Sequence, residues 1–265
     1  MSEKDAGDDA PPMRRVVIVG ASNVVRGIST IYDTSARCWG TPLDFLVAHG
    51  HGRSYGGTSY FLGRGLPGIR QCGLWSDLKE RPPAPTAALL TDVGNDILYG
   101  FEVERIGDWV DQCLSRMAAC SERVIVTELP VHDVERITAR RYNLVRALFF
   151  PQCRLPHREA LDRALRLNEL LCELAERHGA VRVKPLPEWF GLDPIHIRLN
   201  RVGPAWSHIL ASWSDKGPAA PSRPSLRRWL LTRWLRPQFR RLFGFEQRRA
   251  QPAARLPDGG AISYY

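Results

Sequence analysis

The sequence has 265 residues, of which 44% are hydrophobic and 25% are charged, values typical of a globular protein with a sizeable core. No apolar run reaches the length of a membrane-spanning helix, and the acidic, polar first twelve residues do not resemble a secretory signal, so we expect a soluble cytoplasmic protein. The six cysteines have irregular spacing with no C-x-x-C pair, which argues against a zinc site or a disulfide framework and predicts reduced thiols.

The net charge of +9 is unevenly distributed along the chain. Residues 222–265 contain ten arginines and two acidic residues, which accounts for +8 of that charge. Residues 1–221 contain 27 basic and 26 acidic residues and are nearly neutral. The charge therefore bears on the partners of the C-terminal segment and says little about the rest of the protein.

Strand and helix patterns alternate through most of the chain, after a leader at residues 1–13 that we expect to be disordered. Short apolar runs ended by glycine or polar residues are typical of buried parallel strands, and longer runs with a period of 3.6 are typical of helices. The strands are predicted at 15–19, 43–48, 87–91, 123–127 and 181–183, and the helices at 23–32, 106–119, 135–149, 158–178 and 201–213. This order predicts a flavodoxin-like, doubly wound α/β/α sandwich with about five parallel strands over residues 14–215.

Four polar or glycine-rich segments follow predicted strands. They are Gly20-Ala21-Ser22, the loop at 49–58, Gly94-Asn95-Asp96 and Asp193-Pro194-Ile195-His196. Because ligands bind beyond the carboxyl ends of parallel strands, we expect these segments to meet in one crevice. A serine at a helix N-terminus, with a histidine and an aspartate three residues apart on one loop, is a nucleophile with its base and the carboxylate that orients that base.

These four segments, in this order, resemble the blocks of the SGNH (GDSL-type) hydrolase family over roughly residues 15–213. The resemblance implies an esterase that cleaves an acyl ester without a metal or a cofactor. It implies that Ser22 is the nucleophile, His196 the general base and Asp193 its orienting carboxylate. It also implies an oxyanion hole made by the backbone N–H groups of Ser22 and Gly56 and the side-chain amide of Asn95. The substrate stays open between small-molecule, lipid and carbohydrate esters.

Other interpretations of the same residues remain. Ser22 could be a helix N-cap and Asn95 a turn or helix cap. His49 and His51 could suggest a metal site, which we do not favour because no third ligand accompanies them. The family pattern has an aspartate where Ala21 stands and a glycine where Val93 stands, so a catalytically inactive binding module on the same fold is an alternative.

A dinucleotide-binding protein is a weaker alternative for the first segment. The sequence around Gly20 resembles the glycine-rich turn of such proteins, but further glycines at fixed offsets are missing. No acidic residue ends the second strand, where a ribose-binding carboxylate would stand.

The basic, aromatic segment 216–265 is predicted to be a tail with a helix at 225–236 and a second helix from Pro237 through Gly244. Arginines interleave with tryptophan and phenylalanine there, which suits three kinds of contact. We favour docking on the body of the protein or on a protein partner, then contact with an anionic membrane surface, and last a nucleic acid.

Overall fold

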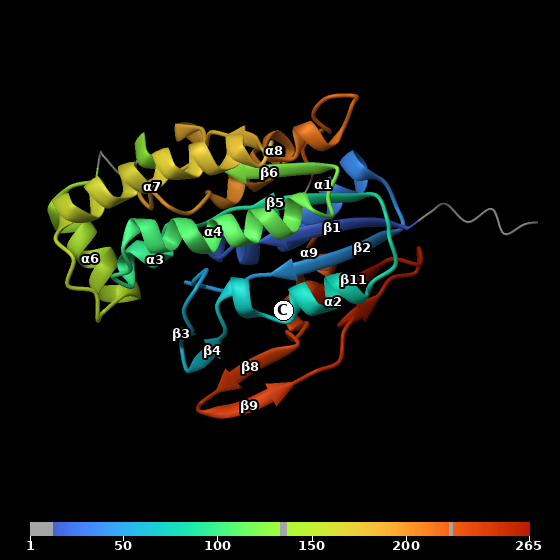
Figure 1. The fold of residues 1–265 in the computed structure, drawn as a ribbon, viewed down its shortest axis with the longest axis horizontal. Coiled ribbons are helices and arrows are strands. Elements are labelled where there is room, and N and C mark those ends of the chain that lie inside the picture. Colours follow the sequence, from blue (N-terminus) through green and yellow to red (C-terminus); the bar gives the residue numbers. More distant parts are fainter. Residues whose placement is uncertain (1–12, 133–136, 223–224) are drawn as a thin grey trace, which may run out of the picture.

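The computed structural model describes residues 13–132, 137–222 and 225–265, and within them the chain forms a seven-stranded sheet, a four-stranded sheet and flanking helices (Figure 1). The order in the large sheet is β10-β11-β2-β1-β5-β6-β7, and all neighbours except β10 and β11 pair in parallel. Its strands are β1 (Arg14–Val19), β2 (Leu43–Ala48), β5 (Thr86–Leu90), β6 (Arg123–Thr127), β7 (Val181–Val183), β10 (Ala254–Arg255) and β11 (Ala261–Tyr264). The predicted α/β/α sandwich and its five parallel strands are confirmed.

Helices cover both faces of the large sheet. They are α1 (Ser22–Trp39), α2 (Leu74–Glu80), α3 (Asn95–Leu98), α4 (Val103–Ala118), α6 (Ala139–Phe149), α7 (His157–Arg177), α8 (Val202–Ile209) and α9 (Leu226–Trp234), with short 3₁₀ turns η1 (Ile69–Gln71), η2 (Pro187–Trp189), η3 (Leu199–Arg201) and η4 (Ala211–Trp213). None of these helices combines the length and the apolar character needed to cross a membrane. Residues 1–12 of the proposed disordered leader and the predicted start of the helix at 135 lie outside the described ranges.

Alternate residues of β1 enter two separate cores. Val17 and Val19 pack into a cluster with residues of α2, α4 and α7, whereas Val16 and Ile18 pack with α1, α8 and η4. Successive side chains of a strand point to opposite faces, so a strand covered on both sides reads as one continuous apolar run. Because β1 is packed on both faces, its position in the sheet is fixed, and so is the position of Ser22, which follows shortly after it.

The C-terminal segment contributes strands to both sheets. β11 extends the large sheet parallel to β2. The small sheet has the order β3-β4-β8-β9. The hairpin of β3 (Ser59–Phe61) and β4 (Arg64–Leu66) meets the hairpin of β8 (Phe239–Leu242) and β9 (Phe245–Arg248) where β4 pairs antiparallel with β8. Figure 1 shows this small sheet at the margin of the layered body. The prediction of a second helix from Pro237 through Gly244 is therefore wrong, because these residues find strand partners in β4 that lie far away in the sequence.

The first tail helix does form, as α9. It lies against α1, where the guanidinium of Arg228 pairs with Asp33 and stands 5.3 Å from the ring centre of Tyr32. Thr232 is buried in this contact, while Leu226, Leu231 and Trp234 remain exposed. The helix thus docks on the body of the protein, with the ion pair of Arg228 and the packing of the adjoining Leu235 among its contacts.

Candidate active site

Ser22 stands at the first turn of α1, directly after the end of β1. Gly20 makes the intervening turn possible, because a Cβ atom there would lie 2.6 Å from Val24 and 2.7 Å from Thr91. The N-cap position belongs to Ala21, so the hydroxyl of Ser22 is not used as a cap. It lies 2.9 Å from Nε2 of His196. The N–H of Ser22 belongs to the helix turn whose amides lack partners within the helix, where the dipole favours negative charge.

His196 and Asp193 share the loop between η2 and η3. Nδ1 of His196 lies 2.6 Å from Oδ2 of Asp193, and the N–H of Ile195 donates to Oδ1 of the same carboxylate at 3.2 Å. Partial burial acts to raise the pKa of Asp193, but the hydrogen bond and charge of His196 outweigh it and hold that pKa below its usual value. The carboxylate is therefore ionised at neutral pH and can fix the tautomer of the ring. Serine, imidazole and carboxylate form one continuous hydrogen-bonded chain.

The side chain of Asn23 connects the loop of His196 to the segment after β5. The sequence analysis did not predict this role. The side-chain amide of Asn23 donates to the carbonyl of Ile195 at 2.9 Å and accepts from the N–H of Ile197 at 2.9 Å, so it grips the backbone on both sides of His196. The same amide donates to Oδ1 of Asp92 at 2.8 Å. Asn23 therefore joins the serine helix to the histidine loop.

Asp92 supplies a carboxylate at the start of α1, although Ala21 stands where the family pattern has one. Its Oδ2 accepts the N–H groups of Ala21 at 3.1 Å and Asn23 at 2.9 Å. Asp92 has φ of +61°, an unusual backbone conformation that turns the chain after β5. A dinucleotide phosphate would need these first-turn N–H groups, so their use by Asp92 argues against the dinucleotide-binding interpretation.

Replacing Asn23 with alanine is expected to lower kcat about 10²-fold with little change in KM. The loop that carries His196 would lose its anchor, and a displacement of about 1 Å in a catalytic group has an effect of this size. Loss of these partly buried hydrogen bonds should also lower the free energy of unfolding by about 1–3 kcal/mol. Steady-state kinetics and urea unfolding would measure both effects.

Asn200→Ala is the matched control, because Asn200 is an exposed asparagine of η3, four positions after His196 in the sequence. Native kcat in Asn23→Ala would show that the loop holds its place without this amide.

The glycine-rich loop is organised by Ser54 and the buried Asp96. Asp96 accepts the hydroxyl of Ser54 through Oδ1 and the N–H of Tyr55 through Oδ2, the latter at 2.8 Å. Burial raises the pKa of Asp96 to about 6, and these two hydrogen bonds oppose that rise. Ser54 Oγ in turn accepts the N–H groups of Gly56 at 3.1 Å and Gly57 at 2.7 Å.

Gly56, predicted to be an oxyanion donor, lies in a different setting from Ser22 and Asn95. Its N–H is already engaged by Ser54, and a Cβ at this position would lie 2.1 Å from the Trp109 ring. Asn95 lines the same cavity as Ser22, and its amide makes one long contact of 3.4 Å to the carbonyl of Arg53. An amide NH₂ has two hydrogens, so the other remains for a ligand. The structure thus brings together Ser22, His196, Asp193 and Asn95, and sets Gly56 apart.

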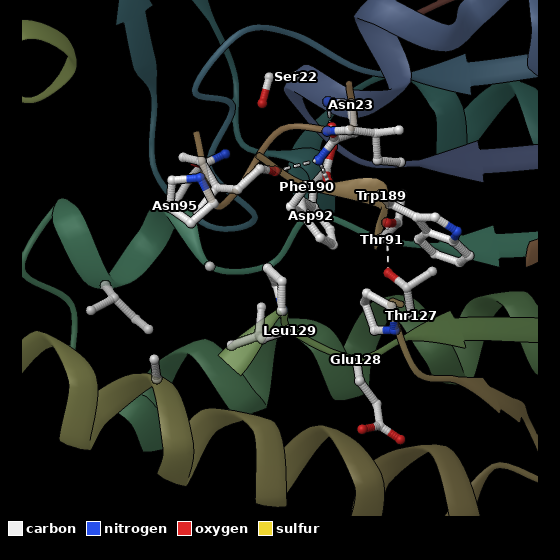
Figure 2. Close-up of a pocket in the computed structure, with 18 of the residues that line it drawn as sticks. Ser22, Asn23, Thr91, Asp92, Asn95, Thr127, Glu128, Leu129, Trp189 and Phe190 are labelled. Atoms are coloured by element: carbon white, nitrogen blue, oxygen red, sulfur yellow. Dashed lines mark hydrogen bonds between the residues drawn. The ribbon is translucent and has the colours of Figure 1, made fainter. Parts of the chain in front are cut away.

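A cavity of about 160 Å³ opens beside Ser22 and Asn95 (Figure 2). Figure 2 shows Leu129, Trp189 and Phe190 around it, with Asn23 and Asp92 close to Ser22. Its apolar walls come from α3, the segment after β6, α6, α7, the segment after β7 and α8, and include Ile97, Leu98, Leu129, Pro130, Tyr142, Ala160, Ala164, Trp189, Phe190, Ile197, Trp206 and Ile209. Such a cavity suits an apolar group attached to the atom that Ser22 attacks.

The two histidines of the glycine loop do not gather metal ligands. Burial, followed by repulsion from Arg64 and Arg53, lowers the pKa of His49 to about 3, so its ring is neutral, and it packs edge-on against Tyr264 with ring centres 4.6 Å apart. The ring of His51 lies 5.1 Å from that of Phe61. Across the described part of the chain, no three histidine, cysteine or acidic side chains are close enough to hold a metal ion.

The fold and site define an α/β protein that carries a Ser-His-Asp chain at the carboxyl ends of its parallel strands. No protein-family model and no curated protein sequence matches the chain. Among solved structures, it is similar to Est24, a carbohydrate acetylesterase from Sinorhizobium meliloti, with a TM-score of 0.52, 11% identity and coverage of 75% of this chain and 98% of that one. A carbohydrate acetylesterase family member from the same organism gives a TM-score of 0.51, 14% identity and coverage of 75% and 95%. These similarities show that the chain has the fold of these esterases.

Proposed function

We propose that this protein is a serine hydrolase that cleaves an acyl ester. The observation that carries the proposal is the hydrogen-bonded chain from Ser22 through His196 to Asp193, with Ser22 at the wall of an apolar cavity. In this geometry His196 accepts the proton of Ser22 while the serine oxygen bonds to the ester carbonyl carbon. Asp193 stabilises the imidazolium cation that forms.

The reaction is completed in two steps by the same groups. When the tetrahedral intermediate collapses, the bond to the leaving alkoxide breaks and His196 returns the proton to it as an alcohol. His196 then takes a proton from water as that water attacks the acyl-serine, and it returns this proton to the serine oxygen as the acyl–oxygen bond breaks and the carboxylic acid leaves. The charge on the intermediate's oxygen is held by the Ser22 N–H, at the positive end of α1, and by the free hydrogen of the Asn95 amide.

The acyl group is proposed to occupy the apolar cavity, and the alcohol to leave toward solvent. Burying apolar surface stabilises the acyl group by about 25 cal/mol for each Å², whereas an alcohol or sugar keeps its hydrogen bonds with water. The similarity to carbohydrate acetylesterases makes small-molecule and carbohydrate esters the first substrates to test.

Reaction with a fluorophosphonate probe tests the proposal without knowledge of the substrate. The serine oxygen would displace fluoride from phosphorus and form a stable phosphonyl-serine, and peptide mass spectrometry should locate this adduct on Ser22. His196→Ala should label at least 10²-fold more slowly, since the base is lost. A heat-denatured sample serves as the control for nonspecific labelling. Folded protein that does not react, or that reacts on another residue, would favour an inactive binding module.

A further inference from the structure

Two β-hairpins of the small sheet end in turns that lie side by side. The β3–β4 hairpin turns at Leu62-Gly63, and the β8–β9 hairpin turns at Phe243-Gly244. β4 pairs with β8, and the N–H of Phe243 donates to the carbonyl of Gly63 at 2.8 Å. The Phe243 ring covers Gly63 so closely that a Cβ there would lie 2.4 Å from the ring. The two turns therefore form one joint tip.

Both turns place a large apolar residue where short hairpin turns favour asparagine or glycine. Leu62 has φ of +49° and Phe243 has φ of +48°, and each precedes a glycine that also has positive φ. Asn-Gly is the preferred pair for such turns, because a bulky side chain is disfavoured in the left-handed region. Two neighbouring turns have the same unfavourable choice, so the stability of the turns does not explain it.

Core packing does not explain these residues either. Leu62 is 83% exposed and Phe243 is 75% exposed, and Phe245, which follows the second turn, is 77% exposed. Tyr60 of β3 is also exposed. Apolar side chains that protrude together from the end of a sheet mark a contact with something outside the protein.

The positive charge of the residues beside this tip indicates which kind of partner it contacts. Segments 59–66 and 239–249 contain five arginines and one glutamate. Arg241 and Arg248 both lie near that glutamate, Glu246, with N–O distances of 2.8 and 3.8 Å, and Arg249 is exposed at the end of β9. The surface is therefore cationic around an apolar tip, which suits the phosphates and acyl region of an anionic lipid surface.

We propose that the paired turns bind anionic membranes, with Leu62, Phe243 and Phe245 entering the lipid interface and the arginines of β8 and β9 contacting lipid phosphates. β3 follows directly from the glycine-rich loop, and in Figure 1 the small sheet lies beside the end of β2 from which that loop departs. The surface is therefore continuous along the chain with the loop that follows β2. It is a property of the hairpins and does not require that the protein be a hydrolase.

Co-sedimentation of the full chain with vesicles tests this surface. We expect binding to vesicles of phosphatidylcholine mixed with phosphatidylglycerol, and much weaker binding to phosphatidylcholine alone. Leu62→Asn and Phe243→Asn should each lower the partition coefficient about tenfold, as expected for one apolar side chain withdrawn from lipid. Both variants create the preferred Asn-Gly turn and should melt at or above the native temperature, so misfolding would not explain the loss.

Further variants separate the cationic contribution and other partners. Arg248→Gln combined with Arg249→Gln should weaken binding only to the anionic vesicles, by about fivefold for each arginine. Leu231→Gln removes an exposed leucine of α9 and should leave binding unchanged. Ser22→Ala should bind as the native protein does, which keeps this test apart from the hydrolase proposal.

Four outcomes would overturn the membrane-binding surface. One is the absence of binding to anionic vesicles, and another is native binding by the two asparagine variants. The third is loss of binding in Leu231→Gln alone, which would move the contact to α9. A fourth is self-association through the tip, which size-exclusion chromatography in the absence of lipid would show if the asparagine variants, and no others, change the oligomeric state.

Discussion

If Ser22 is the nucleophile that we propose, replacing it with alanine is expected to lower kcat by about five to six orders of magnitude, the loss seen when the nucleophile is removed from Ser-His-Asp hydrolases. The hydroxyl of Ser22 is the group that lies 2.9 Å from Nε2 of His196, and Asp193 holds the ring on its other side, so the substitution leaves the base without the hydroxyl that it would activate. Hydrolysis of a chromogenic ester by purified protein, followed over several decades of rate, would measure the effect.

The fold should survive this substitution. Ser22 lies at the start of α1 without a capping role, and its alanine variant leaves only one ring nitrogen of His196 without its present partner. We therefore expect the free energy of unfolding to change by about 1 kcal/mol or less.

Ser35→Ala is the matched control, since Ser35 is a buried serine of the same helix that lies outside the cavity. Ester turnover that persists in Ser22→Ala at a tenth of the native rate or more would assign the nucleophile to another residue.

The parallel sheet could be predicted because its central strands carry their own signal. β1 and β2 are covered on both faces, so each carries a run of four apolar residues in the sequence, at 16–19 and 45–48, and a glycine follows β1 where the chain turns sharply into α1. The proximity of Ser22 to His196 follows from the same logic, because segments after parallel strands meet at one edge of the sheet. Local sequence patterns were therefore enough to predict that Ser22 and His196, 174 positions apart, lie close together.

The C-terminal strands could not be predicted in this way. β8 has two adjacent arginines and β11 has four residues, so neither shows the alternation or the length that identifies a strand from sequence alone. They form because β4 and β2 offer free edges, and the buried guanidinium of Arg53 further joins the glycine-rich loop to the carbonyl of Tyr265. Such pairings depend on the finished fold rather than on local preference.

The hydrogen bonds of Asn23 and Asp92 that position the site could not be predicted from the sequence for a related reason. Asn23 and Asp92 are 69 residues apart, and each looks like an ordinary turn or cap residue in its own segment. The absence of a carboxylate at Ala21 could have indicated that another acidic residue accepts the N–H groups of the first turn of α1, because these groups need an acceptor. The oxyanion donors are a harder problem, because glycine identity does not reveal which N–H in a loop is free. The N–H of Gly56 donates to Oγ of Ser54, and no pattern in the sequence of the loop predicts that hydrogen bond.

Replacing Asn95 with alanine is expected to lower kcat by about 10²–10³-fold, the usual effect of losing one oxyanion donor. The present contact of this amide, 3.4 Å from the carbonyl of Arg53, is too long to contribute much to folding. The melting temperature should therefore stay close to the native value, and KM should change little, because the donor acts on charge that develops only in the transition state.

Asn95→Asp gives the sharper comparison because it keeps the shape of the side chain. A carboxylate cannot donate a hydrogen bond at neutral pH, and its negative charge would repel the oxyanion, so the loss of kcat should exceed that of the alanine variant. Steady-state kinetics of both variants, with thermal melts recorded in parallel, would measure this order. An aspartate variant as active as the native protein would show that the amide faces away from the developing charge, and the oxyanion would then depend on backbone donors alone.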